Sequence, residues 1–180
     1  MMRVGMRAGV AALALLLAAP ATAGVVTSGA DGFLLRYEGF VGKPPALMWD
    51  ALVDWGGWWP DAHTYSGKAS NLDLDVEADG ELEEEWDGGA VLHGSVLQAM
   101  PGKMLRLSAN FGPLQALPVN GVLDIVLKPE GAGTRVVMTY RVGGPVSAGL
   151  QPLALPVDAV LGQGFGRLLM HQAPEKKEEK

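Results

Sequence analysis

The sequence predicts an α+β fold in which a curled antiparallel sheet of about seven strands surrounds a long C-terminal helix. Between residues 71 and 142, short runs alternate apolar and polar residues, which is the period of strands with one buried face. Short turn sequences separate these runs, and closely spaced strands joined by short turns form antiparallel meanders. Near the C-terminus the apolar spacing changes to three and four residues, which is typical of an amphipathic helix.

The chain before residue 71 predicts a strand and then helical structure. The strand is expected within residues 26–40, where Phe33, Leu35 and Tyr37 alternate with their neighbours. A helix is expected in "PPALMWDALVD", because prolines suit a first helical turn and because Leu47 and Ala51 recur at helical spacing.

The strands of the meander are expected at three clear runs, residues 72–76, 119–128 and 135–142, and in the segments between them. The sequences "ADGE", "WDGGA", "MPGKM" and "PEGAGT" provide turns at the strand ends. The alternation favours a sheet with one apolar and one wet face.

The C-terminal helix has one apolar face, formed by Val157, Val160, Leu161, Gly164, Phe165 and Leu168. Pro152 and Pro156 are expected to kink or restart it. Each glycine of "GQGFGR" costs a helix about 1 kcal/mol relative to alanine. Close packing against the sheet would offset that cost, and so would room for a ligand beside Gly164; the sequence leaves both open.

Residues 1–23 have the charged, apolar and small-residue order of a secretory signal peptide. The apolar run from Ala8 to Ala19 is shorter than the roughly 20 residues that cross a bilayer, which favours cleavage after Ala23 over a retained anchor. The expected organisation is therefore a signal peptide (1–23), one domain (24–173) and a disordered charged tail (174–180). A cleaved chain would be periplasmic or secreted, without stable membrane insertion.

The charge balance excludes some partners. The net charge is −6, and removal of Arg3 and Arg7 would bring it near −8. Such a protein repels phosphate backbones, so we expect no nucleic-acid binding. The acidic run "ELEEE" (81–85) lacks the ligand spacing of a calcium loop and reads as a solvated strand, and we expect neither a metal nor a cofactor.

The order of elements, with "PALMWDALVDWGGWWP", "GKMLRLSANFGPLQ" and "GTRVVMTYRVGG", resembles the START-like, or Bet v 1-like (SRPBCC), superfamily. It is most similar to the polyketide cyclase/lipid transport and Hsp90-ATPase-activator-homologue groups. The resemblance covers about residues 26–172. It implies a helix-grip fold, a pair of short helices after the first strand, and a cavity between the sheet and the C-terminal helix for an apolar ligand.

Four of the five tryptophans lie within "WDALVDWGGWW". Two interpretations compete: indole rings that anchor the core, and rings that line a cavity mouth, with Trp59 the candidate for the second. Because aromatic side chains dominate core energetics, we expect mainly anchors.

The histidines favour a binding protein over an enzyme. General acid–base catalysis needs a partner within hydrogen-bond reach, and no spacing provides one for His63, His93 or His171. His171 suits a stabilising place at a helix C-terminus. Both faces around His93 are apolar, so its orientation stays open. The sequence predicts no catalytic residue.

The leading hypothesis is an exported carrier of a small apolar or amphipathic molecule, lipid-like or polyketide-like, in a state of assembly that the sequence leaves open. A dry void of about 300 Å³ would cost roughly 7 kcal/mol, so the cavity should be small or filled. Tyr140 would orient the ligand, and Leu123→Trp would block uptake. The expected lining is Trp59, Leu105, Leu107, Phe111, Leu123, Ile125, Met138, Tyr140, Leu161, Phe165 and Leu168.

Two alternatives remain. A cyclase or aromatase-type enzyme would use the same cavity, with His93 or Tyr140 as acid or base, and an inward His93 beside Glu85 or Asn110 would favour it. A protein-binding regulator like the Hsp90 activators conflicts with the signal peptide, because those chaperones work in the cytosol.

Overall fold

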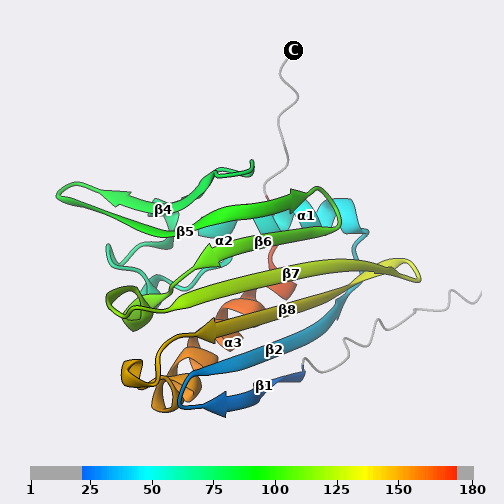
Figure 1. Cartoon of the computed structure of the whole chain (residues 1–180). Helices are drawn as coiled ribbons and strands as arrows, with labels where there is room; N and C mark the ends of the chain where they lie inside the picture. The colour runs from blue at the N-terminus through cyan, green and yellow to red at the C-terminus, as the bar shows by residue number, and fades with distance from the viewer. Residues whose placement is uncertain (1–21, 174–180) are drawn as a thin grey trace, which may run out of the picture.

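The computed structural model describes residues 22–173 and contains one antiparallel sheet of eight strands. Along the sheet the strands follow the order β1-β2-β8-β7-β6-β5-β4-β3, and the sheet curls around the helices on one face (Figure 1). The strands are β1 (Thr22–Gly29), β2 (Gly32–Val41), β3 (Leu72–Leu74), β4 (Glu81–Trp86), β5 (Gly89–Met100), β6 (Met104–Ala109), β7 (Asn120–Glu130) and β8 (Gly133–Gly143). The predicted α+β architecture is confirmed.

The sheet has eight strands instead of the predicted number of about seven, because the segment predicted as the first strand is a hairpin of two strands. β1 pairs with β2 through a tight turn in which Gly29 is opposite Gly32. The sequence "SGADG" carries this turn, and the alternation of the longer β2 hid it. The predicted signal peptide (1–23) and charged tail (174–180) lie outside the described residues, except that the backbone of Thr22 and Ala23 forms the start of β1.

Two short helices, α1 (Pro45–Val53) and α2 (Trp55–Trp58), follow β2, so they come after the second strand of the chain. Pro45 opens α1 at a position where a helix needs no backbone donor. The buried face of α1 contains Met48, Trp49, Ala51 and Leu52, whereas Leu47, which the spacing places on the apolar stripe, is 55% exposed. α1 is thus rotated relative to the prediction.

The long helix α3 (Ala154–Met170) lies against the same face of the sheet, behind β2 and β8 in Figure 1. Pro156 lies in its first turn, where the missing N–H costs no hydrogen bond. Its buried residues match the predicted apolar face apart from half-buried Val160, with Ala154 in addition: Ala154, Val157, Leu161, Gly164, Phe165 and Leu168.

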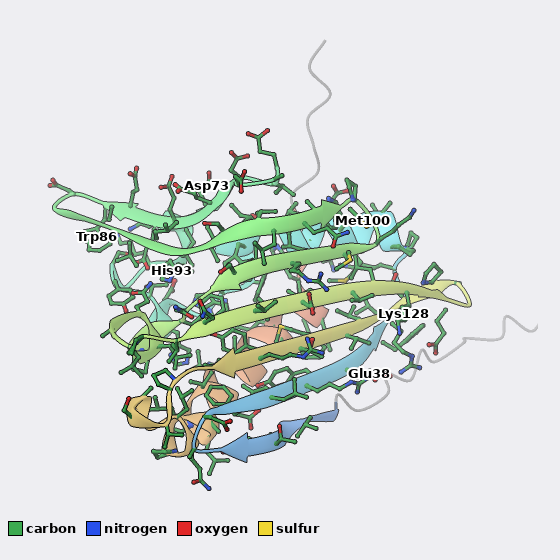
Figure 2. All side chains as sticks on the ribbon, in the orientation of Figure 1. Glu38, Asp73, Trp86, His93, Met100 and Lys128 are labelled. Atoms are coloured by element: carbon green, nitrogen blue, oxygen red, sulfur yellow. The ribbon has the colours of Figure 1, made fainter. Side chains whose placement is uncertain are left out.

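The other face of the sheet carries charged side chains, such as Glu38 and Lys128 in Figure 2. Ion pairs link neighbouring strands there: Asp124 on β7 accepts hydrogen bonds from Arg106 on β6 and Arg141 on β8. Among the described residues, no helix is long and apolar enough to cross a membrane.

Candidate ligand-binding cavity

A cavity of about 670 Å³ lies at one end of the sheet, between the N-terminal half of α3 and the loops opposite it. Four segments form it: residues 59–65 after α2, His93 on β5, residues 111–116 after β6, and residues 156–161 of α3. Tyr65 in its wall is 52% exposed, so the cavity opens to solvent. The cost of a dry void therefore does not apply to it.

Most of the cavity wall is apolar. The α3 side consists of Pro156, Val157, Val160 and Leu161, whose spacing of three and four residues places them on one helix face. On the other side, the 3-10 helix η3 (Gly112–Ala116) presents Pro113 and Ala116. An apolar wall with a few polar groups is the common composition of small-molecule sites.

Trp59 and Phe111 connect the cavity to an aromatic cluster in the core. The ring centroids of Trp59 and Phe111 are 5.7 Å apart, and those of Trp55 and Trp58 are 4.5 Å apart. The indole N–H of Trp58 donates to the Leu52 carbonyl, and that of Trp59 to the His63 carbonyl, both at 3.0 Å. The tryptophans are therefore buried anchors, and Trp59 also lines the cavity.

Gly164 makes room for these tryptophans. A Cβ atom at this position would lie 3.0 Å from Cζ3 of Trp59 and 3.4 Å from Cζ3 of Trp58. The space beside this glycine is filled by indole rings of the chain itself. Neither the sheet nor a ligand takes it.

The polar side chains around the cavity are largely paired with one another. The Tyr65 hydroxyl donates to Oε1 of Gln115 at 2.9 Å, and the Gln115 amide donates to the Leu92 carbonyl at 3.0 Å. His63 Nε2 lies 2.8 Å from Oε1 of Gln163 on α3. These bonds join the two loops, β5 and α3 around the opening.

His93 faces inward and pairs with a buried carboxylate. Its Nε2 lies 3.0 Å from Oε2 of Glu84 on β4, and His93 and Glu84 are 6% and 0% exposed. The backbone N–H of Tyr65 donates to Oε2 of Glu84 at 3.1 Å, and that of Ser66 to Oε1 at 2.5 Å. Glu84 thus holds the 65–66 loop and His93 together at the cavity wall.

The hydrogen bonds keep Glu84 ionised. Burial by itself would raise the pKa of the Glu84 carboxyl, but the hydrogen bonds from Ser66, Tyr65 and His93 outweigh it and lower that pKa below its usual value. An ionised carboxylate only accepts hydrogen bonds, so the Nε2 of His93 carries the hydrogen that Glu84 receives.

A β-bulge turns His93 inward. Leu82 on β4 is opposite Gly94 and the next residue, Glu83, is opposite Leu92, so His93 has no opposite residue on β4. A bulge breaks the alternation of faces, and here His93 and Gly94 are both buried while Leu92 is 51% exposed. Figure 2 shows His93 at the end of the sheet beside the β6–β7 connection.

Only part of the predicted lining meets at this cavity, namely Trp59, Phe111 and Leu161. The hydroxyl of Tyr140 donates to the Ala109 carbonyl at 2.8 Å, inside the core. Leu123 is 1% exposed within the sheet, so Leu123→Trp would disturb the core instead of filling the cavity. The predicted residues that are buried away from the cavity are Leu105, Leu107, Leu123, Ile125, Met138, Tyr140, Phe165 and Leu168.

The predicted lining omitted most residues of the two loops and of the first turns of α3, and it also omitted Glu84, which lies behind the cavity wall. The whole "ELEEE" run reads as a solvated strand, but Glu84 shares the inner face of β4 with Leu82. The alternation of faces along β4 could have revealed this, because residues two apart, Leu82 and Glu84, point to the same buried face while Glu85 is exposed. His171, at the C-terminal end of α3, pairs with Asp54 at 2.7 Å, away from the cavity. Among residues 22–173, no group of acidic or histidine side chains is placed to hold a metal ion.

Solved structures share this fold. CalU16 from Micromonospora echinospora matches with a TM-score of 0.55 at 16% identity, over 84% of this chain and 83% of that one. MLL2253 from Mesorhizobium loti matches with a TM-score of 0.55 at 21% identity, over 76% and 94%. EF2215 from Enterococcus faecalis, a conserved protein of unknown function, matches with a TM-score of 0.58 at 14% identity, over 88% and 82%.

At these identities the likeness establishes a common fold and nothing finer. No family model matches the chain, and no curated protein matches it.

Proposed function

We propose that this protein binds a small apolar or amphipathic molecule, lipid-like or polyketide-like, in the cavity between α3 and the loops at the end of the sheet. The observation that carries the proposal is the cavity of about 670 Å³ with its largely apolar wall. Ligand pockets usually measure about 300–1,000 Å³ and combine apolar walls with few polar groups. The resemblance to the START-like superfamily supports the same reading, and membership of that superfamily is part of the proposal.

Export is the second part of the proposal. The order of charged, apolar and small residues in 1–23 supports cleavage after Ala23. N-terminal sequencing of the protein recovered from the periplasm or medium tests it, and the expected first residue is Gly24. Recovery of the full-length chain in the cytosol would contradict it.

The first experiment is native mass spectrometry of the exported protein, followed by organic extraction of any bound molecule. We expect a stoichiometric adduct of an apolar compound. Because a weak ligand is lost during purification, a titration with an apolar fluorescent dye accompanies the measurement. Absence of both adduct and dye binding would refute the proposal.

A pair of neighbouring substitutions on α3 locates the site. Val160 lines the cavity, whereas Ala159 is exposed and does not. Val160→Trp should fill part of the cavity and weaken dye binding at least tenfold, while Ala159→Trp should leave it unchanged. Equal effects of the two variants would place the bound molecule elsewhere.

A second function, a cyclase or aromatase-type enzyme, is favoured by one observation. His93 faces inward and is backed by Glu84, in the arrangement of a histidine that moves protons. The residue beside it is Glu84, one position from the Glu85 suggested by the sequence. Incubation with linear poly-ketone substrates tests this function: the enzyme would release one water per ring closed, and His93→Gln would abolish that reaction. A bound but unchanged substrate would leave the carrier function.

A further inference from the structure

One ring nitrogen of His93 has no hydrogen-bond partner in the protein. The side chain is 6% exposed and lines the cavity, and its Nε2 is taken by Glu84. Within residues 22–173, Nδ1 of His93 makes no hydrogen bond. Among residues 22–173 the fully buried side-chain atom without a partner is Oδ1 of Asn110, so Nδ1 of His93 keeps some exposure and can take a partner that enters the cavity.

The protonation state of the pair makes Nδ1 an acceptor. Glu84 receives three N–H groups, from Tyr65, Ser66 and His93, so the hydrogen of the neutral imidazole sits on Nε2. Nδ1 then presents a lone pair. This lone pair can accept a hydrogen bond from a strong donor.

The other polar groups at the cavity leave this role to His93. Gln115 uses its oxygen for Tyr65 and its amide for the Leu92 carbonyl, and the Thr64 hydroxyl donates to the Asp61 carbonyl. His63 lies at the more exposed rim and contacts Gln163. The groups that face the His93 ring are Glu84 from β4 and the ring of Tyr65, whose centroid is 5.8 Å away.

We propose that the Glu84–His93 pair is the polar end of the cavity and selects ligands whose apolar body carries one acidic hydroxyl group, a carboxylic acid or a phenol. The O–H of the ligand donates to Nδ1 of His93, while the apolar body lies against Trp59, Phe111 and Leu161. This inference rests on the proposed binding function and specifies the chemical class of its ligand.

Four naphthalene probes of nearly equal size test the selection: naphthoic acid, naphthol, the methyl ester of the acid and the methyl ether of the phenol. The methylated probes keep the apolar body and lose the acidic hydrogen. Dissociation constants come from quenching of tryptophan fluorescence or from calorimetry. We expect the acid or the phenol to bind about ten to one hundred times more tightly than its methylated partner, the usual effect of a hydrogen bond to a charge-assisted group.

Comparison of the acid with the phenol shows which of the two groups, carboxylic acid or phenol, the cavity prefers. In neutral solution the acid is ionised, so its binding as the hydrogen-bonded acid takes up one proton from the buffer. The phenol binds with no proton exchange. Calorimetry in two buffers of different ionisation enthalpy measures this proton uptake. Together with the dissociation constants, it identifies whether the carboxylic acid or the phenol is preferred.

Two histidine variants locate the contact. In His93→Gln the side-chain amide can still donate to Glu84, but the acceptor at Nδ1 is gone. The matched control is His63→Gln at the rim of the same cavity. We expect the ratio of affinities for acidic and methylated probes to fall to about one in H93Q and to stay unchanged in H63Q.

The outcomes separate this inference from the proposed function. If no probe and no apolar dye binds the unaltered protein, the proposed function fails and the inference with it. If all four probes bind equally, or if H93Q keeps the preference, the cavity binds ligands but this selection is wrong.

Nitrogen NMR of isotopically labelled histidine provides a test without substitution at His93, in case H93Q does not fold. Single substitutions at His63 and His171 assign the remaining resonance to His93. Addition of the tighter-binding acidic probe, acid or phenol, should shift the resonance of Nδ1 of His93, because this unprotonated nitrogen then accepts a hydrogen bond. An unchanged resonance at saturating probe would overturn the inference.

Discussion

Nε2 of His93 lies 3.0 Å from Oε2 of Glu84; both side chains are buried, and His93 lines the cavity with Glu84 behind it. Glu84 comes from β4 near the edge of the sheet, and its two oxygens also accept the backbone N–H groups of Tyr65 and Ser66. One carboxylate therefore determines both the orientation of the histidine and the position of a cavity wall.

Glu84→Gln should destabilise the fold by about 3 kcal/mol, as the breaking of buried charged hydrogen bonds usually does. The amide replaces one accepting oxygen with donors, which then face the N–H groups of Ser66, Tyr65 or His93. Urea unfolding at neutral pH measures the difference. The exposed neighbour provides the control, and Glu85→Gln should change the free energy of unfolding by no more than about 0.5 kcal/mol. Equal small effects of both variants would contradict the buried network.

Stability should fall in acid in a way that depends on Glu84. The folded protein holds the pKa of this carboxyl below its usual value of 4.5, so the unfolded chain binds more protons as the pH falls. The contribution of Glu84 is therefore complete above about pH 4.5 and is lost as the pH drops towards the lower, folded value. Urea unfolding between neutral pH and acid should show a steeper loss for the unaltered protein than for Glu84→Gln. Parallel curves would exclude this role.

Two glycines of α3 should respond differently to alanine. At Gly166 an added Cβ meets no atom within 4 Å, so Gly166→Ala should stabilise the helix by up to about 1 kcal/mol. Gly164→Ala gains the same helix propensity but places its Cβ 3.0 Å from Trp59. It should therefore be the less stable of the two variants in thermal or urea unfolding. If Gly164→Ala proved as stable as Gly166→Ala, the indole rings would not be what requires a glycine there.

Tyr140→Phe should lower stability by about 1 kcal/mol and leave ligand affinity unchanged. The hydroxyl donates to the Ala109 carbonyl in the core, and its burial raises the pKa of Tyr140 far above the usual value. Because Tyr140 does not line the cavity, dye binding should stay within about twofold. Tyr65→Phe is the matched comparison, because it also removes a tyrosine hydroxyl, but from a residue that lines the cavity. Loss of binding in Tyr140→Phe would restore the sequence-based hypothesis that this hydroxyl orients the ligand.

The sequence predicted the sheet and the long helix because their signals are local. In β7, β8 and α3 the apolar residues recur at the period of the element, and the buried residues of α3 match that stripe with few exceptions. The N-terminal hairpin was missed because the two-residue connection between Gly29 and Gly32 interrupts the alternation only briefly.

The site was predicted less well, because a cavity forms where segments far apart in sequence meet. Trp59, Phe111 and Leu161 were identified, but nothing local shows that the inward residues of the central strands pack fully against one another. The need for a glycine at position 164 was also not predictable from nearby sequence, because its neighbours Trp58 and Trp59 come from the end of α2.

By itself the sequence determined the α+β class, the meander, the amphipathic C-terminal helix and the anchoring tryptophans, since hydrophobic period and aromatic burial act along the chain. Only the tertiary structure decided the inward direction of His93, its pairing with Glu84 and the place of the cavity. The inward direction of His93 follows from the β-bulge in β5 where that strand pairs with β4. A bulge depends on the register between two strands, which the residues of one strand alone do not specify.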